Sequence, residues 1–208
     1  MAQRIENIYR IVTFPAFYRG LHAMLGSHAA RERYVAEMLR PRAGQRMLDV
    51  GCGPGTIVPY LPDVDYTGMD MNPRHIEFAK AEYGHRGRFL RGDVTKMKVA
   101  EGEKFDLINV AAILHHIDDD LSKQLLKSLL DLLAPGGRII TSDPVYVPRQ
   151  RPVAWLFNAL DSGKNVRTPE GYLALVDQTQ CRVQTKLYND FFRVPYDHFC
   201  MTISRTDA

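Results

Sequence analysis

The sequence predicts an α/β protein whose β-sheet is mostly parallel and carries helices on both faces. From Met47 onward, short apolar runs of strand length alternate with stretches of helical spacing, which is typical of βαβ units. A glycine-rich turn follows the first apolar run, at the position where α/β folds bind nucleotides. Two apolar runs near the C-terminus are expected to close the sheet as an antiparallel pair.

The composition is that of an ordinary globular chain. It has 208 residues, of which 45% are apolar and 25% charged, so we expect one domain, or one domain with an appendage. The net charge of +3 is uneven, because residues 1–46 contain eight Arg and three Glu but no Lys or Asp. This pattern favours a solvated, amphipathic helical face, and an anionic substrate, a nucleic acid or a membrane surface is the alternative partner.

The cysteines and the N-terminus predict a cytoplasmic protein. Cys52, Cys181 and Cys200 are widely spaced and form no C-x-x-C pair, which argues against a disulfide framework or a zinc site and for a reducing compartment. The first residues lack a signal-peptide core, and no apolar run approaches the roughly 20 residues of a spanning helix. We therefore expect a soluble protein without a membrane span.

The segment before the first strand is predicted to form two helices. Ile5, Ile8 and Ile11 recur at helical spacing and Pro15 ends or bends that helix. Ser27 or His28 opens a second helix that ends before Pro41. We expect residues 1–43 to be a helical lid over the substrate and residues 44–208 to be the main domain.

Strands and helices are predicted in turn along the main domain. The expected strands are Met47–Val50, Tyr66–Asp70, Arg88–Leu90, Phe105–Val110, Arg138–Ser142, Val183–Tyr188 and Phe199–Ser204. The glycine turn is expected to lead into a helix, and further helices are expected from Pro73 to Tyr83, from Asp118 to Leu133 and from Pro169 to Gln178. Asn72 and Thr168 are suited to cap two of these helices, each followed by proline. Residues 143–167 are irregular, with an apolar stretch at Val153–Leu160.

The glycine turn discriminates between two kinds of nucleotide ligand. It reads Gly51-Cys52-Gly53-Pro54-Gly55, and glycines let a backbone adopt positive φ and approach a ligand closely. A dinucleotide site requires G-x-G-x-x-G, but Thr56 occupies the place of the third glycine. Asp49, just before the turn, suits a ligand with an ammonium group better than one with a pyrophosphate. An NAD(P) oxidoreductase is therefore disfavoured.

With its neighbours, this turn resembles the first motif of class I S-adenosylmethionine-dependent methyltransferases. Four further matches follow in the family's order: Gly68-Met-Asp70-Met71, Gly92-Asp93-Val94, Phe105-Asp-Leu-Ile-Asn109-Val-Ala111 and Leu133-Ala-Pro-Gly-Gly137. The resemblance is strong over residues 44–143 and points to the small-molecule, type 11 or UbiE-like group. It implies a Rossmann-like sheet of seven strands in the order 3-2-1-4-5-7-6.

The resemblance also implies a binding site for S-adenosylmethionine, which leaves as S-adenosylhomocysteine. Asp70 is expected to accept hydrogen bonds from both ribose hydroxyls and Asp93 from the adenine amino group. Met71 and Val94 are expected to sandwich the adenine ring, while the Val94 N–H donates to a ring nitrogen. Gly51 and Gly53 are expected to leave room for the methionine part and the sulfonium. The other expected cofactor contacts are Asp49, Cys52, Gly55, Asn109 and Ala111.

Candidate catalytic residues follow the fourth and fifth strands. A histidine there is poised to act as a base near neutral pH, and we expect His116 in this role ahead of His115. Asp143 is a second acid–base or substrate-binding candidate. The acidic run Asp118-Asp119-Asp120 suits a helix N-terminus better than a metal site, because consecutive acids on a helix cannot face one ion. We therefore expect no metal.

The methyl acceptor is expected to be a small molecule. Tyr18, Arg19, Tyr146 and Arg167 are candidate substrate contacts. A nucleic-acid methyltransferase is the first alternative, disfavoured because Asn109-Val-Ala-Ala112 lacks the double proline of enzymes that act on base amines, and because no RNA-binding module is appended. A non-catalytic protein that binds the cofactor is the second. Transfer to oxygen, nitrogen or carbon, and the oligomeric state, stay open.

Overall fold

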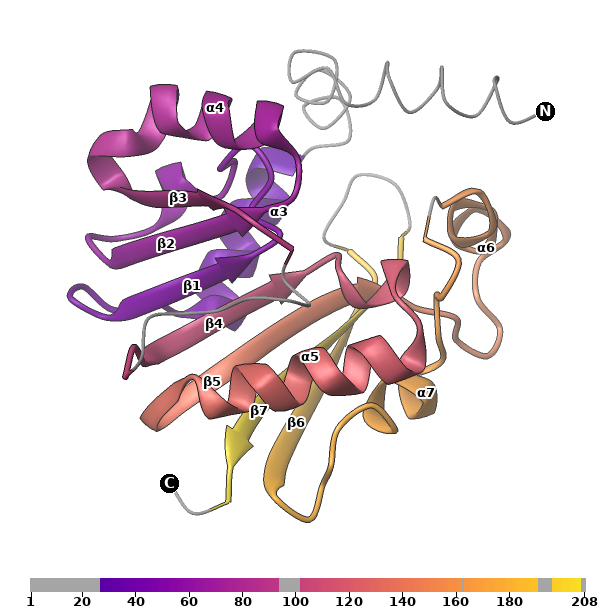
Figure 1. The fold of residues 1–208 in the computed structure, drawn as a ribbon. Coiled ribbons are helices and arrows are strands. Elements are labelled where there is room, and N and C mark those ends of the chain that lie inside the picture. Colours follow the sequence, from indigo (N-terminus) through magenta and orange to yellow (C-terminus); the bar gives the residue numbers. More distant parts are fainter. Residues whose placement is uncertain (1–26, 94–101, 162, 191–195, 207–208) are drawn as a thin grey trace.

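The computed structural model describes residues 27–93, 102–161, 163–190 and 196–206. Its centre is a seven-stranded sheet in the order β3-β2-β1-β4-β5-β7-β6, which confirms the expected order (Figure 1). The strands are β1 (Arg46–Val50), β2 (Asp65–Asp70), β3 (Gly87–Arg91), β4 (Phe105–Ala111), β5 (Leu133–Pro144), β6 (Cys181–Tyr188) and β7 (His198–Arg205).

The sheet is parallel from β3 to β5 and antiparallel beyond it. β1 pairs in parallel with β2 on one side and with β4 on the other, and β7 runs antiparallel to both β5 and β6. Met47, Leu48 and Val50 of β1 are fully buried, as expected for a strand whose two faces are both covered. The predicted antiparallel closure by the last two strands is therefore correct.

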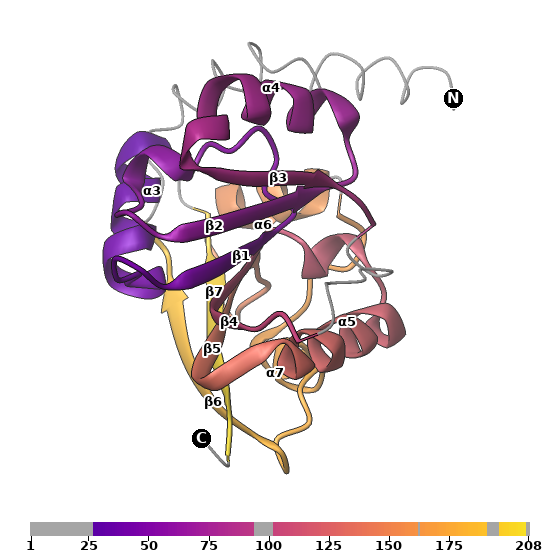
Figure 2. The same cartoon turned by 60° about the vertical axis from the view of Figure 1, so that its left-hand side comes forward.

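Helices cover both faces of the sheet. Residues 27–39 form α3 (Ser27–Tyr34) followed by the π-helix η1 (Val35–Leu39), and α4 spans Pro73–Tyr83. The buried side chains of these helices pack with β1 and β2, whereas those of α5 (Asp119–Asp131) and α7 (Pro169–Leu173) pack with β4, β5 and β7. α3 and α5 consequently lie on opposite sides of the sheet (Figure 2).

Three predicted helix starts carry side-chain caps. The side chain of Asn72 accepts a hydrogen bond from Arg74 N at 3.0 Å, with Pro73 in the first position of α4. Asp118 caps α5 through Leu121 N at 2.9 Å, and Thr168 caps α7 through Gly171 N at 3.2 Å. These bonds satisfy amide groups that a helix N-terminus leaves without partners, so local sequence determines where each helix begins.

Other elements differ from the sequence predictions. The glycine turn leads into the three-residue 3-10 helix η2 (Val58–Tyr60) instead of the expected α-helix, and Pro54, Pro59 and Pro62 explain why a longer one does not form. α7 ends at Leu173, short of Gln178. The apolar stretch in the segment that was expected to be irregular forms the helix α6 (Pro152–Leu160). β5 begins at Leu133, so the expected turn at Ala134–Gly137 is part of this strand, and the register against β4 shifts between Phe105 and Leu107.

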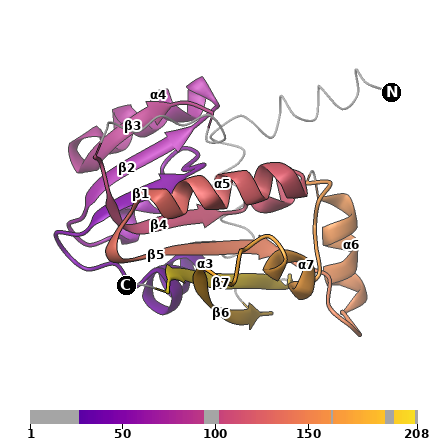
Figure 3. The ribbon, with the colours of Figure 1, turned by 60° about the horizontal axis from the view of Figure 1, so that its bottom comes forward.

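The carboxyl ends of β1 to β5 meet at one edge of the sheet, and this edge positions the site. α6 lies at that end of the molecule, beyond β5 (Figure 3). The predicted lid (residues 1–43) falls largely outside the described residues, and its described part, α3 with η1, shares a core with β1 and β4. Within the described residues, no helix has both the length and the apolarity that crossing a membrane requires.

Candidate active site

The glycine turn after β1 has backbone conformations that glycine adopts more easily than other residues. Gly51, Gly53 and Gly55 have φ values of 71°, 54° and 75°, which other residues rarely adopt. The amides of Gly51 and Cys52 donate to the carbonyl oxygen of Met69 at 2.8 and 3.0 Å, so the turn is bound to the end of β2. A Cβ on Gly53 would have no heavy atom within 4 Å, which shows open space beside the turn.

Asp70 joins this turn to the end of β2. Its Oδ2 accepts from Gly53 N at 2.9 Å, its Oδ1 accepts from Asn72 N at 2.8 Å, and His75 Nδ1 lies 3.5 Å from Oδ1. Burial acts to raise the pKa of Asp70, but the contacts with His75, Asn72 N and Gly53 N outweigh it and lower the pKa. The side chain is therefore a charged carboxylate, and each oxygen keeps a lone pair for a further donor.

The end of β3 is attached to the same place. Gly92 N donates to the carbonyl oxygen of Asp70 at 3.0 Å, which brings the partly buried Asp93 to the edge where β1 and β2 end. Met71 is 62% exposed and follows Asp70 directly. Val94 lies outside the described residues. The turn, Asp70 and Asp93 thus share one edge, as a nucleoside site requires.

Asp49 and Asn109 belong to a buried chain of hydrogen bonds. Asn109 Nδ2 donates to Asp49 Oδ1, Tyr66 Oη donates to Asp49 Oδ2, and Tyr34 Oη donates to Asn109 Oδ1, each at 2.7 Å. Burial raises the pKa of Asp49 to about 6, although the bonds from Tyr66 and Asn109 lower it. The sequence reading did not foresee Tyr34 and Tyr66, which tie α3 and β2 to the two residues expected at the cofactor.

The loop after β4 carries the histidines. β4 ends at Ala111, and Ala112 has a φ of 57°, with its amide bonded to Ser142 O at 2.8 Å. A non-glycine residue at positive φ is a strained feature of the kind that occurs at functional sites. The 3-10 helix η5 (Leu114–His116) then places His115 inside the protein, 3% exposed, and His116 at the surface.

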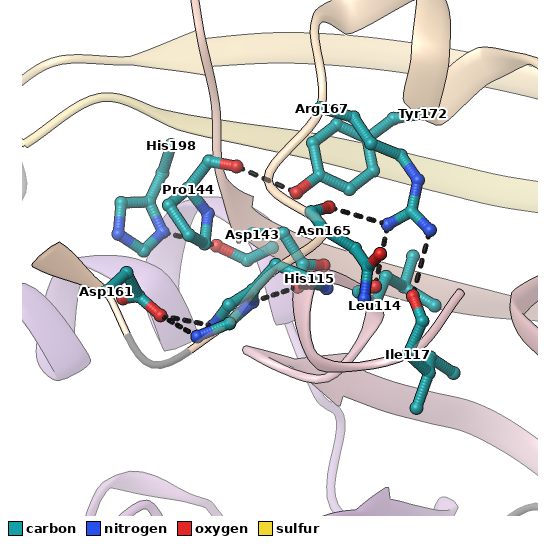
Figure 4. A network of polar contacts seen from close by, with 12 residues as sticks. Leu114, His115, Ile117, Asp143, Pro144, Asp161, Asn165, Arg167, Tyr172 and His198 are labelled. Atoms are coloured by element: carbon teal, nitrogen blue, oxygen red, sulfur yellow. Dashed lines mark hydrogen bonds and ion pairs between the residues drawn. The ribbon is translucent and has the colours of Figure 1, made fainter. Parts of the chain in front are cut away.

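His115 is held between two carboxylates (Figure 4). Its ring Nδ1 donates to Asp143 Oδ1 at 2.8 Å, and its backbone N–H donates to the same oxygen at 3.2 Å. Its Nε2 lies 3.4 Å from Asp161 Oδ1. Burial lowers the pKa of a histidine, but the two carboxylates outweigh burial and raise the pKa of His115 to about 9. His115 therefore carries a proton at neutral pH in the free protein.

His116 has a different environment. Its ring centroid lies 4.0 Å from that of His115, and both desolvation and the charge of His115 lower its pKa. Asp143, by contrast, is 1% exposed, and within the described part of the chain its Oδ2 has no hydrogen-bond partner. The geometry thus fixes His115 with Asp143 in the interior and leaves His116 at the surface as the histidine whose pKa is lowered.

Asp161 is the functional candidate that the sequence reading missed. It lies in a loop after α6, far from His115 in sequence, and accepts from Gly163 N at 2.6 Å and from Tyr196 Oη at 2.8 Å. These bonds and the one with His115 outweigh burial and lower the pKa of Asp161 strongly. The sequence signal for Asp161 is the polar run at residues 161–165, which follows the apolar stretch Val153–Leu160. Only the fold brings Asp161 close to η5.

The predicted substrate contacts have mixed outcomes. Tyr18 and Arg19 lie outside the described residues, and Tyr146 is half-buried, with its amide bonded to Arg167 O at 3.0 Å. The guanidinium of Arg167 donates to the carbonyl oxygens of Leu114, Ile117 and Asn165 at 2.7 to 2.9 Å and contacts Asp119 at 2.8 Å. Arg167 therefore stabilises the loop that carries the histidines.

Residues 47–137 match a family model described as a methyltransferase domain. A ubiquinone biosynthesis O-methyltransferase of Vibrio cholerae is 30% identical over 117 residues, which are 54% of this chain and 47% of that protein. A 27-O-demethylrifamycin SV methyltransferase of Amycolatopsis mediterranei is 31% identical over 122 residues, covering 55% of this chain and 44% of that protein. The match thus spans less than half the length of each relative.

The fold has close counterparts among solved structures. A TehB-like S-adenosylmethionine-dependent methyltransferase from Corynebacterium glutamicum superposes with a TM-score of 0.70 at 19% identity, covering 95% of this chain and 99% of the other. Together with the sheet order, these findings show a methyltransferase domain at residues 47–137, within a chain that has the fold of S-adenosylmethionine-dependent methyltransferases.

Proposed function

We propose that this protein transfers the methyl group of S-adenosylmethionine to a nucleophile, most simply a hydroxyl oxygen, of a small molecule. The observation that carries the proposal is the position of Asp70, whose charged carboxylate is bonded to the amide of Gly53 in the glycine turn. A diol-binding acid beside a strained glycine turn suits a nucleoside with a compact positively charged tail. The name of one relative, an O-methyltransferase, and that of the other, which acts on a 27-O-demethylrifamycin, support an oxygen acceptor.

The chain's own residues fit this cofactor. Each Asp70 oxygen already accepts one backbone N–H and has a lone pair left for a ribose hydroxyl. Asp93, tethered through Gly92, would bind adenine, Met71 and Val94 would flank it, and Gly51, Cys52, Gly53 and Gly55 would line the methionine part. Asp49, Asn109 and Ala111 would lie next to that part, where the buried carboxylate of Asp49 would suit an ammonium group.

The acceptor is proposed to bind at the carboxyl ends of β4 and β5, where His115 and Asp143 lie. The bound cofactor supplies a methyl group on a sulfonium leaving group, so the protein must align the nucleophile and take up its proton. Asp143 fixes the His115 ring through Nδ1, and Asp161 faces its Nε2. We propose His116, whose pKa is lowered, as the base that takes up this proton, and the protonated His115 beside it as the group that orients the acceptor.

We also propose that the protein works in the cytoplasm. All three cysteines are free and buried, which fits a reducing compartment. The proposed acceptor is a small molecule with an ionisable hydroxyl group.

Calorimetry with S-adenosylhomocysteine tests the cofactor site. We expect Asp70→Ala to weaken binding at least 100-fold, because two charge-assisted hydrogen bonds, at about 1.5–3 kcal/mol each, are lost. Asp63→Ala, an exposed acid in the loop before β2, is the control and should bind normally. Normal affinity in a folded Asp70→Ala protein, or a preference for NAD, would refute the proposal.

A further inference from the structure

We propose that Asp161 is the positioning residue for His115, and that Asp161 together with residues 163–167 forms a clamp that fixes the orientation and charge of this imidazole. The inference rests on the proposed function for its catalytic meaning, but the contacts that support it do not depend on any cofactor. It extends the site to a part of the chain outside the region that matches the methyltransferase family, residues 47–137.

The first step is the fit between the segment and the histidine loop. A Cβ on Gly163 would overlap the His115 ring and lie 2.7 Å from the His115 carbonyl oxygen, so only glycine allows this approach. Asn165 N donates to that same carbonyl oxygen at 3.0 Å. Two backbone positions of the segment therefore pack directly against His115.

The second step is the brace at the end of the segment. Arg167 bonds the carbonyl oxygens of Leu114 and Ile117, on either side of the histidines, and its side chain is 9% exposed. Figure 4 shows the guanidinium reaching over this loop from the opposite side to Asp161. Arg167 thus holds the loop on both sides of the histidines, and its charged guanidinium is the donor to these carbonyl oxygens.

The third step is the carboxylate itself. Asp161 Oδ2 accepts from Tyr196 Oη and Oδ1 accepts from Gly163 N, so the carboxylate is pre-oriented before it meets His115 Nε2. Asp143 holds the other ring nitrogen from β5. With both ring nitrogens facing fixed carboxylates, the imidazole has one orientation, and its proton affinity is determined by charges from two distant parts of the chain.

The charged and titratable groups around His115 come from several elements. They are Asp143 at the end of β5, His116 on η5, Asp161 after α6, Arg167 before α7, and Tyr196 and His198 at the start of β7. Asp143 and Asp161 are the anions in contact with the ring. Removing the charge of Asp161 should therefore shift the titration of His115 without requiring a change of fold.

The test follows the His115 ring by NMR in histidine-labelled full-length protein without cofactor. We expect Asp161→Asn to move the titration midpoint of His115 at least one pH unit lower than in the unmodified protein. Asp119→Asn is the matched control, because Asp119 contacts Arg167 in the same network but not His115. It should leave the midpoint within a few tenths of a unit.

A second variant covers the case in which Asp161→Asn does not fold. Gly163→Ala keeps every charge but displaces the ring from the clamp, and we expect the His115 resonances to shift and broaden. An unchanged titration in Asp161→Asn, or an unchanged His115 signal in Gly163→Ala, would overturn the proposal. Micromolar binding of Co²⁺ that is lost in both Asp161→Asn and His116→Ala would also overturn the proposal, because it would indicate a metal site instead. His115, His116 and Asp161 offer ligand atoms within 4.8 Å of one another. Failure of the unmodified protein to bind S-adenosylhomocysteine would refute the proposed function but not the clamp.

Discussion

Asp49 shows how a single buried carboxyl group can report on the ligand. It is 3% exposed, and in the free protein burial raises its pKa to about 6 against the bonds from Tyr66 and Asn109. A nearby positive charge would favour the carboxylate and lower this pKa. The occupancy of the site and the ionisation of Asp49 should consequently be linked.

We predict that S-adenosylhomocysteine binding releases protons near pH 5.5, below the pKa of about 6 that burial gives Asp49 in the free protein. Calorimetry in two buffers of different ionisation enthalpy measures this release. Asp49→Asn should abolish the dependence on the buffer. Equal binding heats in both buffers for the unmodified protein would show that Asp49 does not sense the ligand.

Tyr34 connects a helix to the sheet through one hydroxyl group. Its Oη donates to Asn109 Oδ1, and both side chains are buried. Tyr34→Phe leaves the amide oxygen of Asn109 without this donor, and we predict a loss of about 1–3 kcal/mol in the free energy of unfolding. Urea unfolding measures the loss. Tyr60→Phe is the control, because Tyr60 contacts His28 through its ring; equal losses in the two variants would contradict the explanation.

At the scale of elements, short-range chemistry accounts for the starts of α4, α5 and α7. Asn72, Asp118 and Thr168 each cap the helix that follows them. The acidic residues at the start of α5 differ in their contacts: Asp118 caps the helix, whereas Asp119 contacts Arg167. Neighbouring acids that looked equivalent in the sequence have different tasks.

We predict that Asp118→Ala lowers the free energy of unfolding by about 1 kcal/mol, as loss of an N-cap does. Asp118→Ser should keep most of the stability, because serine also caps. Asp120→Ala, which removes an exposed acid from the first turn, should cost a few tenths of a kcal/mol. Thermal unfolding of the three variants checks this order, and a larger loss in Asp120→Ala than in Asp118→Ala would reverse the assignment.

Elements without such local signals were harder to predict. The glycine turn leads into a 3-10 helix because prolines interrupt the expected α-helix. α6 carries four exposed large apolar residues, Val153, Trp155, Leu156 and Phe157, so its apolar run did not reveal which structure would contain it. Apolar runs of this length fit a strand or a helix equally well.

At the scale of the whole molecule, the His115 network couples pH to stability. In the unfolded chain a histidine has a pKa near 6.5, while in the folded protein the two carboxylates hold the pKa of His115 at about 9. The folded state therefore binds the proton more tightly. This contribution is present in full below about pH 6.5 and is lost as the pH rises through 9.

We predict that the free energy of unfolding falls between pH 6.5 and 9.5 by at most about 3 kcal/mol more in the unmodified protein than in His115→Gln. Urea unfolding at several pH values measures the difference. His85→Gln, a change at an exposed histidine, is the control and should follow the unmodified protein. Parallel pH dependences in His115→Gln and the unmodified protein would show that the network carries no such linkage.

The sequence by itself determined the fold and the edge of the sheet that is proposed to bind the cofactor. The alternation of apolar runs, the glycines at Gly51 and Gly53, and the acids at the ends of the second and third strands are local patterns, and parallel strands bring their carboxyl ends together. The order of the strands followed from the family resemblance, and the observed sheet has that order. Asp70 and the turn accordingly meet as expected.

The tertiary structure alone decided which histidine is held and by what. His115 and His116 are neighbours in the sequence, but η5 turns one inward and the other outward. Asp161, 46 residues further along the chain, meets His115 because α6 and its loop return to the end of β4. Burial and long-range contact depend on how the whole chain packs, and no local pattern encodes either one.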